Sequence, residues 1–194
     1  GFDTFNGVKT FLYLEFSPEP SGFDSDPDKR IISAGFNPEA GQEINIRYGL
    51  SYISTDQARR NLQRDITGWN IGEVSSAARE KWNSVLSSVL VEGGTEQQKR
   101  VFYTSLYRCF ERMTDITEDG QYFSAWSSRT ESANDTSFFT DDWVWDTYLA
   151  LHPLQVILNP GDQDEKLASY IRMARQSGWM PTFPTVTGDN HAMN

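Results

Sequence analysis

Apolar side chains recur at every second position in two stretches of the first 54 residues, over positions 8–16 and 44–52. A period of two is typical of strands with one buried face. A shorter apolar run covers residues 31–36, and the stretch over 17–28 is rich in Pro, Gly, Ser and Asp, so we expect a loop there. Because three strands cannot protect their own edges, we expect residues 1–54 to be the end of a larger antiparallel β domain.

The pattern changes to helical spacing after Ser54. Ser54 and Gln57 are spaced as a capping box that would open a first helix. Apolar residues three and four positions apart predict a second helix over residues 74–89. Another capping box, Thr95 with Gln98, precedes a third helix. Strands followed by helices indicate a multidomain β + α chain.

A long segment without helical spacing covers residues 114–140 and is rich in Asp, Gly, Ser, Thr and aromatic residues. A loop of this length is usually functional or disordered, and its aromatic residues argue against disorder. Apolar spacing then predicts a helix over 142–158, in which Pro153 should cause a kink or a break near His152. A last helix is expected to begin at Asp162.

Composition narrows the choice of partners. The net charge is −10, which argues against a nucleic-acid partner. The single cysteine, Cys109, excludes an internal disulfide and is expected to be a small core residue. No apolar run approaches the roughly 20 residues of a membrane span. The start at Gly1 has neither a basic segment nor an apolar leader, so we expect a mature or excised piece.

Candidate chemistry concentrates at the head of the helix predicted over 142–158. Two tryptophans, Trp143 and Trp145, are interleaved with the carboxylates of Asp141, Asp142 and Asp146. The C–H face of a pyranose stacks on an aromatic ring, and its hydroxyls donate to carboxylate oxygens, so this pattern suits a sugar-binding surface. The alternative is an acidic helix start followed by aromatic core residues.

Asp142 and Asp146 are four positions apart and would share a helix face, with Cβ atoms roughly 5–6 Å apart. An inverting glycosidase holds its acid and base about 6.5–9.5 Å apart, but on opposite sides of the bond that breaks. Neighbours on one helix turn approach from the same side. We therefore interpret Asp141 and Asp142 as acids that complement the helix dipole, and Asp146 as a candidate ligand contact.

The two histidines, His152 and His191, are far apart in the sequence, and there is no HExxH motif or cysteine pair to indicate zinc. We expect His152, next to a proline, to be structural, and His191 is a candidate for a residue that faces a site. The acidic clusters at 24–28 and 162–165 lack the glycine and the final glutamate of an EF-hand loop. The sequence thus predicts no metal ligand.

Four stretches, taken together, resemble glycoside hydrolase family 92, the calcium-dependent exo-acting α-mannosidases. They cover residues 46–66, 77–110, 139–160 and 169–184. The resemblance implies an N-terminal β-sandwich, a pair of linker helices and an (α/α)6 barrel that bears the active site. It maps the last sandwich strands, the linker and the start of the barrel onto residues 1–54, 55–94 and 95–194.

The resemblance also implies inverting hydrolysis of terminal α-linked mannose on glycans, with Ca²⁺ helping to distort the sugar. The Trp-Asp pair that contacts the sugar in the −1 subsite of the family falls on Trp145 and Asp146, with Trp143 and His191 as further candidate contacts. The general acid, the general base and the main calcium ligands are expected beyond Asn194. A secreted, periplasmic or cell-surface location is implied as well.

The chain departs from the family pattern at two positions, where Trp143 replaces a common serine and Leu149 a common arginine. These changes put linkage preference in question. Two rival functions stay open, a non-catalytic carbohydrate-binding or scaffold module and a hydrolase of mannose-1-phosphate diesters. The 194 residues alone are expected to be inactive, because the rest of the parent chain is needed for a complete fold.

Overall fold

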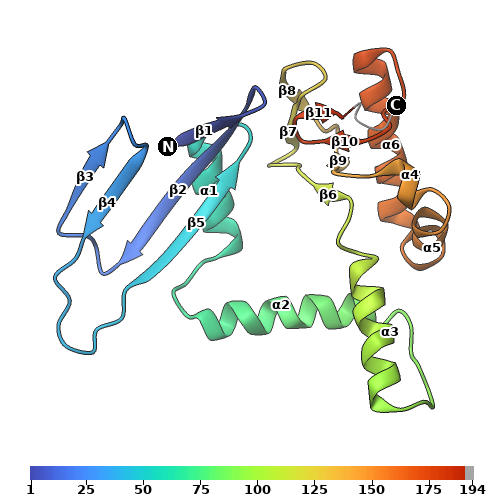
Figure 1. Ribbon diagram of the computed structural model, residues 1–194, viewed down its shortest axis with the longest axis horizontal. Coiled ribbons are helices and arrows are strands. Elements are labelled where there is room, and N and C mark those ends of the chain that lie inside the picture. The colour runs from blue at the N-terminus through green and yellow to red at the C-terminus, as the bar shows by residue number, and fades with distance from the viewer. Residues whose placement is uncertain (191–194) are drawn as a thin grey trace. The chain divides into compact units, whose positions relative to one another are not determined.

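The computed structural model describes residues 1–190 and divides the chain into two compact units (Figure 1). The first unit consists of Gly1–Asp3 and Thr10–Val74, and the second of Thr4–Lys9 and the chain from Ser75 onward. Among the described helices, none is both long and apolar enough to cross a membrane. Strands and helices are mixed along the chain, as the sequence predicts.

The strands of the N-terminal region form a three-stranded sheet and a separate hairpin. The sheet has the order β1 (Phe2–Phe5), β2 (Val8–Ser17) and β5 (Asn45–Ser51), and the hairpin pairs β3 (Gly22–Asp26) with β4 (Ile31–Gly35). The predicted strands are confirmed, but the loop expected over residues 17–28 is wrong because it contains β3. Apolar alternation is absent from β3, which is held by main-chain pairing with β4.

One face of the sheet is covered by α1 (Thr55–Asp65), which begins where the Ser54 side chain accepts a hydrogen bond from the Gln57 N–H at 3.0 Å. Ala58 and Leu62 of α1 are buried against β5. Gly49 permits this close approach, because a Cβ there would lie 2.1 Å from the carbonyl oxygen of Ala58.

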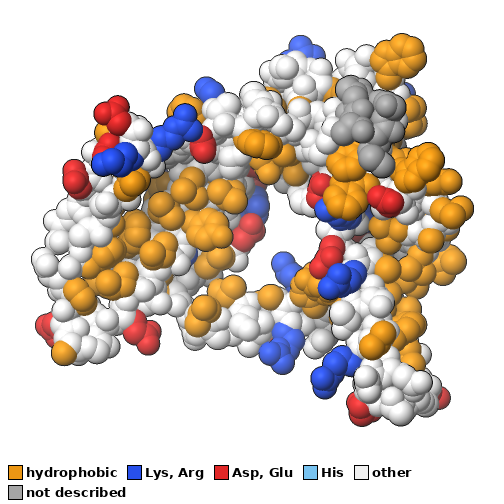
Figure 2. All heavy atoms as spheres, viewed as in Figure 1, with side chains coloured by type: hydrophobic (Ala, Val, Ile, Leu, Met, Phe, Trp, Pro, Cys, Tyr) orange, Lys and Arg blue, Asp and Glu red, His pale blue; other side chains and the backbone are white. Residues whose placement is uncertain are grey.

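The opposite face of the sheet is open and apolar, and Figure 2 shows orange side chains gathered over it. Tyr48 is 58% exposed and Ile46 likewise points away from α1, as the alternation along β5 requires. The residues of β2 paired with them continue the same face. An exposed apolar surface of this kind is usually covered by another element in the complete molecule.

Two longer helices follow, α2 (Ile71–Leu86) and α3 (Glu96–Arg108). Both hydrogen bonds of the predicted capping box form at the start of α3, between Thr95 and Gln98. Cys109 ends α3 and is half-buried, and burial raises the pKa of its thiol. Cys109 was expected to be a small core residue, and because its side chain is only half-buried this expectation holds in part.

The segment 114–140, expected to be one long loop, contains β6 (Thr114–Asp115), β7 (Gln121–Ser124), β8 (Arg129–Ser132) and β9 (Phe139–Thr140). β7 pairs with β8, and β6 with β9. The rings of Tyr122 and Phe138 stack with centroids 3.8 Å apart, and both side chains are buried. Tyr122 and Phe138 are thus packing residues, and the prediction of one long loop is wrong because the segment contains strands.

The helix predicted over 142–158 is broken in two, α4 (Val144–Thr147) and α5 (Leu151–Leu158), as Pro153 suggested. Pro153 lies in the first turn of α5, where its missing N–H costs nothing. The next helix, α6 (Pro160–Ser177), begins at Pro160 rather than at Asp162, because proline is favoured at the first helical position. A short hairpin of β10 (Pro184–Thr185) and β11 (Gly188–Asp189) closes the described chain.

Candidate functional site

An open pocket of about 400 Å³ lies in the second unit between α4 and the segment just before β10. Trp145 and Asp146 of α4 line it, and Trp145 is 76% exposed. Within residues 1–190, no side chain bonds or pairs with the exposed Asp146 carboxylate. The remaining lining residues are Trp143, Val144, Tyr148, Pro181, Thr182 and Phe183. The pocket therefore presents an open indole beside a carboxylate whose acceptor positions are available.

Trp143 is a fixed part of the same pocket. Its ring stacks on Phe183, with centroids 5.4 Å apart and planes 22° apart. The Arg112 guanidinium lies 4.0 Å from the centroid of the Trp143 ring and forms an ion pair with Asp141 at 3.2 Å. A cation over an aromatic ring and a stacked partner hold the indole in place. Leu149, the position where the family pattern has arginine, is not among the pocket residues.

The wall opposite α4 is held by Asp189 of β11. Its carboxylate accepts hydrogen bonds from the N–H of Thr182 at 3.1 Å and of Phe183 at 2.7 Å. Further back, the Asp142 N–H donates to the carbonyl oxygen of Pro184 at 3.0 Å. The two walls of the pocket are thus joined by a main-chain hydrogen bond directly behind Trp143.

Asp142 has a different role from the one expected. Its side chain is fully buried and accepts hydrogen bonds from the Thr147 hydroxyl at 3.0 Å, His152 Nε2 at 2.9 Å and the Tyr170 hydroxyl. The prediction that it shares a helix face with Asp146 is wrong, because Asp142 precedes α4 and points inward while Asp146 points to solvent. Asp142 is therefore not simply an acid that complements the helix dipole, as expected, and the partly exposed Asp141, which also precedes α4, pairs with Arg112.

The pKa values of Asp142, His152 and Tyr170 reflect both their burial and the hydrogen bonds between them. Burial alone would raise the pKa of Asp142, but hydrogen bonds from His152, Tyr170 and Thr147 together hold that pKa below its usual value. The hydrogen bond to Asp142 raises the pKa of His152 despite partial burial. Burial, with the hydrogen bond to Asp142, raises the pKa of the Tyr170 hydroxyl. The lowered pKa favours an ionised Asp142, which accepts hydrogen bonds from His152, Tyr170 and Thr147.

The structure brings Trp143, Trp145 and Asp146 to one pocket, while His191 lies outside the described residues. His152 is structural, as expected. The buried cluster of Asp142, Thr147, His152 and Tyr170 was missed by sequence reasoning. Its only sequence signal is a histidine and a tyrosine on later helices, and no spacing rule connects them to Asp142.

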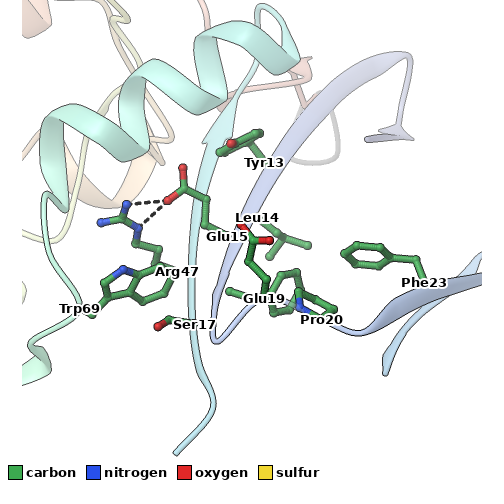
Figure 3. A pocket seen from close by; sticks show the side chains of 10 residues that line it. Tyr13, Leu14, Glu15, Ser17, Glu19, Pro20, Phe23, Arg47 and Trp69 are labelled. Atoms are coloured by element: carbon green, nitrogen blue, oxygen red, sulfur yellow. Dashed lines mark hydrogen bonds and ion pairs between the residues drawn. The ribbon is translucent and has the colours of Figure 1, made fainter. Parts of the chain in front are cut away.

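A second pocket, of about 620 Å³, lies in the first unit (Figure 3). Arg47 lies at its polar end, with Nε donating to Glu15 at 2.8 Å and Nη1 to the carbonyl oxygens of Ile66 and Gly68 at 3.0 and 3.3 Å. The Trp69 ring lies against the same guanidinium, with its centroid 4.5 Å away. The charges of Arg47 and Glu15 are therefore used within the fold, whereas the exposed Glu19 also lines this pocket.

Comparisons with known proteins agree on one family. Residues 57–194 match the model of the glycosyl hydrolase family 92 catalytic domain. A secreted glycosidase of Arthroderma benhamiae, described as uncharacterized, is 28% identical over 121 residues, which cover 60% of this chain and 13% of that protein. Among solved structures, a family 92 inverting mannosidase of Bacteroides thetaiotaomicron matches with a TM-score of 0.82 and 28% identity.

An α-mannosidase of family 92, also from Bacteroides thetaiotaomicron, has a TM-score of 0.84 and 20% identity, and its likeness shows the fold alone. Each of these structures is matched over 96% of this chain, but the chain spans only 27% and 28% of their respective lengths. The match of the family model extends over well more than half of the sequence. The chain therefore belongs to glycosyl hydrolase family 92.

Proposed function

We propose that this chain is part of a glycosidase that removes terminal α-linked mannose from glycans. In this proposal Trp145 and Asp146 form one wall of the subsite that holds the terminal sugar. One observation carries it: in a chain of family 92, an exposed indole and an available carboxylate adjoin in a pocket of about 400 Å³.

The chemistry of the pocket suits a pyranose. The 76% exposed face of Trp145 would pack against the apolar face of the ring, and Asp146 would accept hydrogen bonds from two hydroxyls. Trp143, held by Phe183 and Arg112, would bound the opposite side of the sugar. Trp143 is bulkier than the serine common in the family, so it would narrow the space beside the sugar.

Catalysis would be completed by groups from other parts of a longer protein. Inversion at the anomeric carbon needs a separate acid and base on opposite sides of the scissile bond, and we place both beyond Asn194. Calcium is also part of the proposal. Its main ligands are proposed to lie beyond Asn194; within residues 1–190, no group of three or more His, Cys, Asp or Glu side chains is placed to hold a metal ion.

The domain arrangement is proposed on the same basis. Residues 1–54 would be the last strands of a β-sandwich, 55–94 the linker and 95–194 the start of an (α/α)6 barrel. The open apolar face of β2 and β5 supports the first assignment, because the second sheet of a sandwich would cover it. The secreted relative supports export of the complete protein across a membrane.

The test uses the full-length protein that contains this chain. We expect hydrolysis of an aryl α-mannoside and of an α-linked mannobiose, with no turnover of a matched aryl α-glucoside. A mannose-1-phosphate diester is assayed in parallel. Turnover of the diester alone would favour the phosphodiester hydrolase, and binding of mannose without turnover of any substrate would favour a non-catalytic module; either result would overturn the proposal.

A further inference from the structure

The two walls of the pocket come from separate segments, and a buried carboxylate lies where they meet. One wall is α4, which carries Trp145 and Asp146, and the other is the segment Pro181–Phe183. Asp142 is two residues before α4, and its N–H donates to the carbonyl oxygen of Pro184, directly after the second wall. Its main chain thus ties the walls together, and its side chain is free to hold other elements.

That side chain reaches three helices. Thr147 is the last residue of α4, His152 lies in the first turn of α5, and Tyr170 is in the middle of α6. All three bond to Oδ2 of Asp142, which is fully buried. The carboxylate is therefore the point where α4 is attached to the two longer helices behind it.

The wall that carries Trp145 and Asp146 has little stability of its own. α4 is only four residues long, and its N-cap residue, Trp143, makes no capping hydrogen bond with its side chain. A single helical turn is not stable without tertiary contacts. Since the Trp145 and Asp146 side chains point to solvent, the direction of this turn is set by the inward hydrogen bonds of Thr147 and Asp142 together with the stacking of the N-cap residue, Trp143, on Phe183.

We propose that Asp142 is a positioning residue for the sugar subsite, acting with Thr147, His152 and Tyr170 to fix α4 relative to the Pro181–Phe183 wall. This role rests on the proposed function of the pocket. Burying a carboxylate is costly, and replacing such a cluster by apolar residues is often neutral or stabilising, so stability alone is a weak reason for it. Fixing the geometry of a binding site is a stronger one.

The surroundings of the cluster are built to keep His152 in one orientation. Its Nδ1 lies 3.0 Å from the side-chain nitrogen of Gln163, which is buried on α6. Nε2 is then directed at Asp142. Lys166, also nearly buried on α6, is the nearby positive charge, and Asp162 lies at the start of the same helix. Orientation by a second hydrogen bond is how a histidine is fixed in binding sites generally.

The test compares near-isosteric variants of the full-length protein. Tyr170→Phe and Thr147→Val each remove one hydroxyl from Asp142, and Asp142→Asn removes the charge. Ser169→Ala is the matched control, because Ser169 is equally buried and next to Tyr170, yet its hydroxyl bonds to the Phe139 N–H and the Glu165 carbonyl instead. Each variant is characterised by KM, kcat and melting temperature on the glycoside that the wild type cleaves.

We expect KM to rise on the order of ten-fold in Tyr170→Phe and Thr147→Val, and more in Asp142→Asn, because a small displacement of a positioning wall has large effects. Ser169→Ala should lower the melting temperature and leave KM unchanged. A structural role alone would reduce the amount of folded enzyme, and thus apparent kcat, without changing KM. Wild-type KM in both hydroxyl variants would overturn the proposal.

The test of which glycoside is cleaved can fail independently of the KM comparison between these variants. If the wild type cleaves another glycoside instead of a mannoside, the proposed function fails while the KM comparison on that glycoside still tests the positioning role.

Discussion

The pocket beside α4 and the pocket around Arg47 differ in what their charged groups do. In the larger one, Arg47 and Glu15 pair with each other, and the arginine also binds two carbonyl groups, so these two charges are used within the fold, while the exposed Glu19 lines the cavity as well. In the smaller one, Asp146 is exposed beside an open indole. Pocket volume alone would favour the first, at about 620 against 400 Å³. The adjoining exposed indole and carboxylate of Trp145 and Asp146, within the segment that matches the family's catalytic domain, favour the second.

The smaller pocket also separates two tasks between two carboxylates. Asp146 faces solvent and is available to a ligand. Asp142, four residues earlier, is buried and accepts three hydrogen bonds. In the larger pocket one ion pair is wholly internal. The smaller pocket therefore combines an exposed acceptor, Asp146, with a buried carboxylate, Asp142, that is hydrogen-bonded to the helices around it.

The largest expected effect is on Asp146. In the full-length protein, Asp146→Ala should lower kcat/KM for an aryl α-mannoside by about 100-fold or more, since charge-assisted hydrogen bonds of ~2–3 kcal/mol are lost. The melting temperature should stay within a degree or two, because the side chain is exposed. Asp164→Asn, an exposed acid of α6 outside the pocket, is the control. Unchanged turnover by the Asp146 variant would remove this residue from the site.

In the larger pocket we expect a substitution to lower stability and to leave substrate binding unchanged. Arg47→Met should destabilise the full-length protein by about 2 kcal/mol, because Glu15 and two carbonyl oxygens lose their partner in a partly buried setting. KM for the mannoside should not change. The measurement is a thermal melt alongside steady-state kinetics, and a raised KM with unaltered stability would mean that the larger pocket binds the substrate.

Sequence reasoning was reliable for features encoded in neighbouring residues. The period of two in β2 and β5 and the capping box of Thr95 with Gln98 are local, and the structure confirms them. β3 was missed because its stability comes from pairing with β4 rather than from apolar alternation. The strands within 114–140 were missed for the same reason, since Tyr122 and Phe138 meet only in three dimensions.

In the candidate site, too, only residues that are neighbours in the sequence could be predicted together. Trp145 and Asp146 are adjacent in sequence, so they could be proposed together, and the structure places both on one pocket. Asp142 could not be recognised as buried, because its partners His152 and Tyr170 are ten and 28 residues away on other helices. Whether Trp145 and Asp146 bind a sugar stays a prediction for the experiments above.

A smaller effect on kcat/KM is expected when the exposed ring of Trp145 is removed. Trp145→Ala should lower kcat/KM about ten-fold, through loss of stacking worth roughly 1–1.5 kcal/mol. Trp145→Phe should recover most of the loss, because a smaller aromatic face remains. Trp179→Ala provides the control, since Trp179 is as exposed, at 82%, but does not line the pocket. Equal losses in the two alanine variants would show that the effect is not specific to the pocket.

The smallest effect is a pH dependence of the buried ion pair between Asp142 and His152. The pKa of His152 is raised by Asp142, so its contribution to stability is complete below its usual value near 6.5 and is lost as the pH rises through the raised pKa. The pKa of Asp142 is lowered, so its contribution is present above about 4 and is lost as the pH falls further. The Asp142–His152 pair should therefore stabilise the fold most between about pH 4 and 6.5.

The measurement is the difference in melting temperature between the wild type and His152→Gln, taken in the full-length protein from pH 4 to 9. We expect the difference to be largest in the acidic half of that range and to shrink, without vanishing, at higher pH, because neutral His152 can still donate from Nε2 to Asp142. Lys166 and Asp162, the other charges near the cluster, are unchanged by the substitution. A difference that grows above pH 7 would contradict an ionised Asp142 that favours protonated His152.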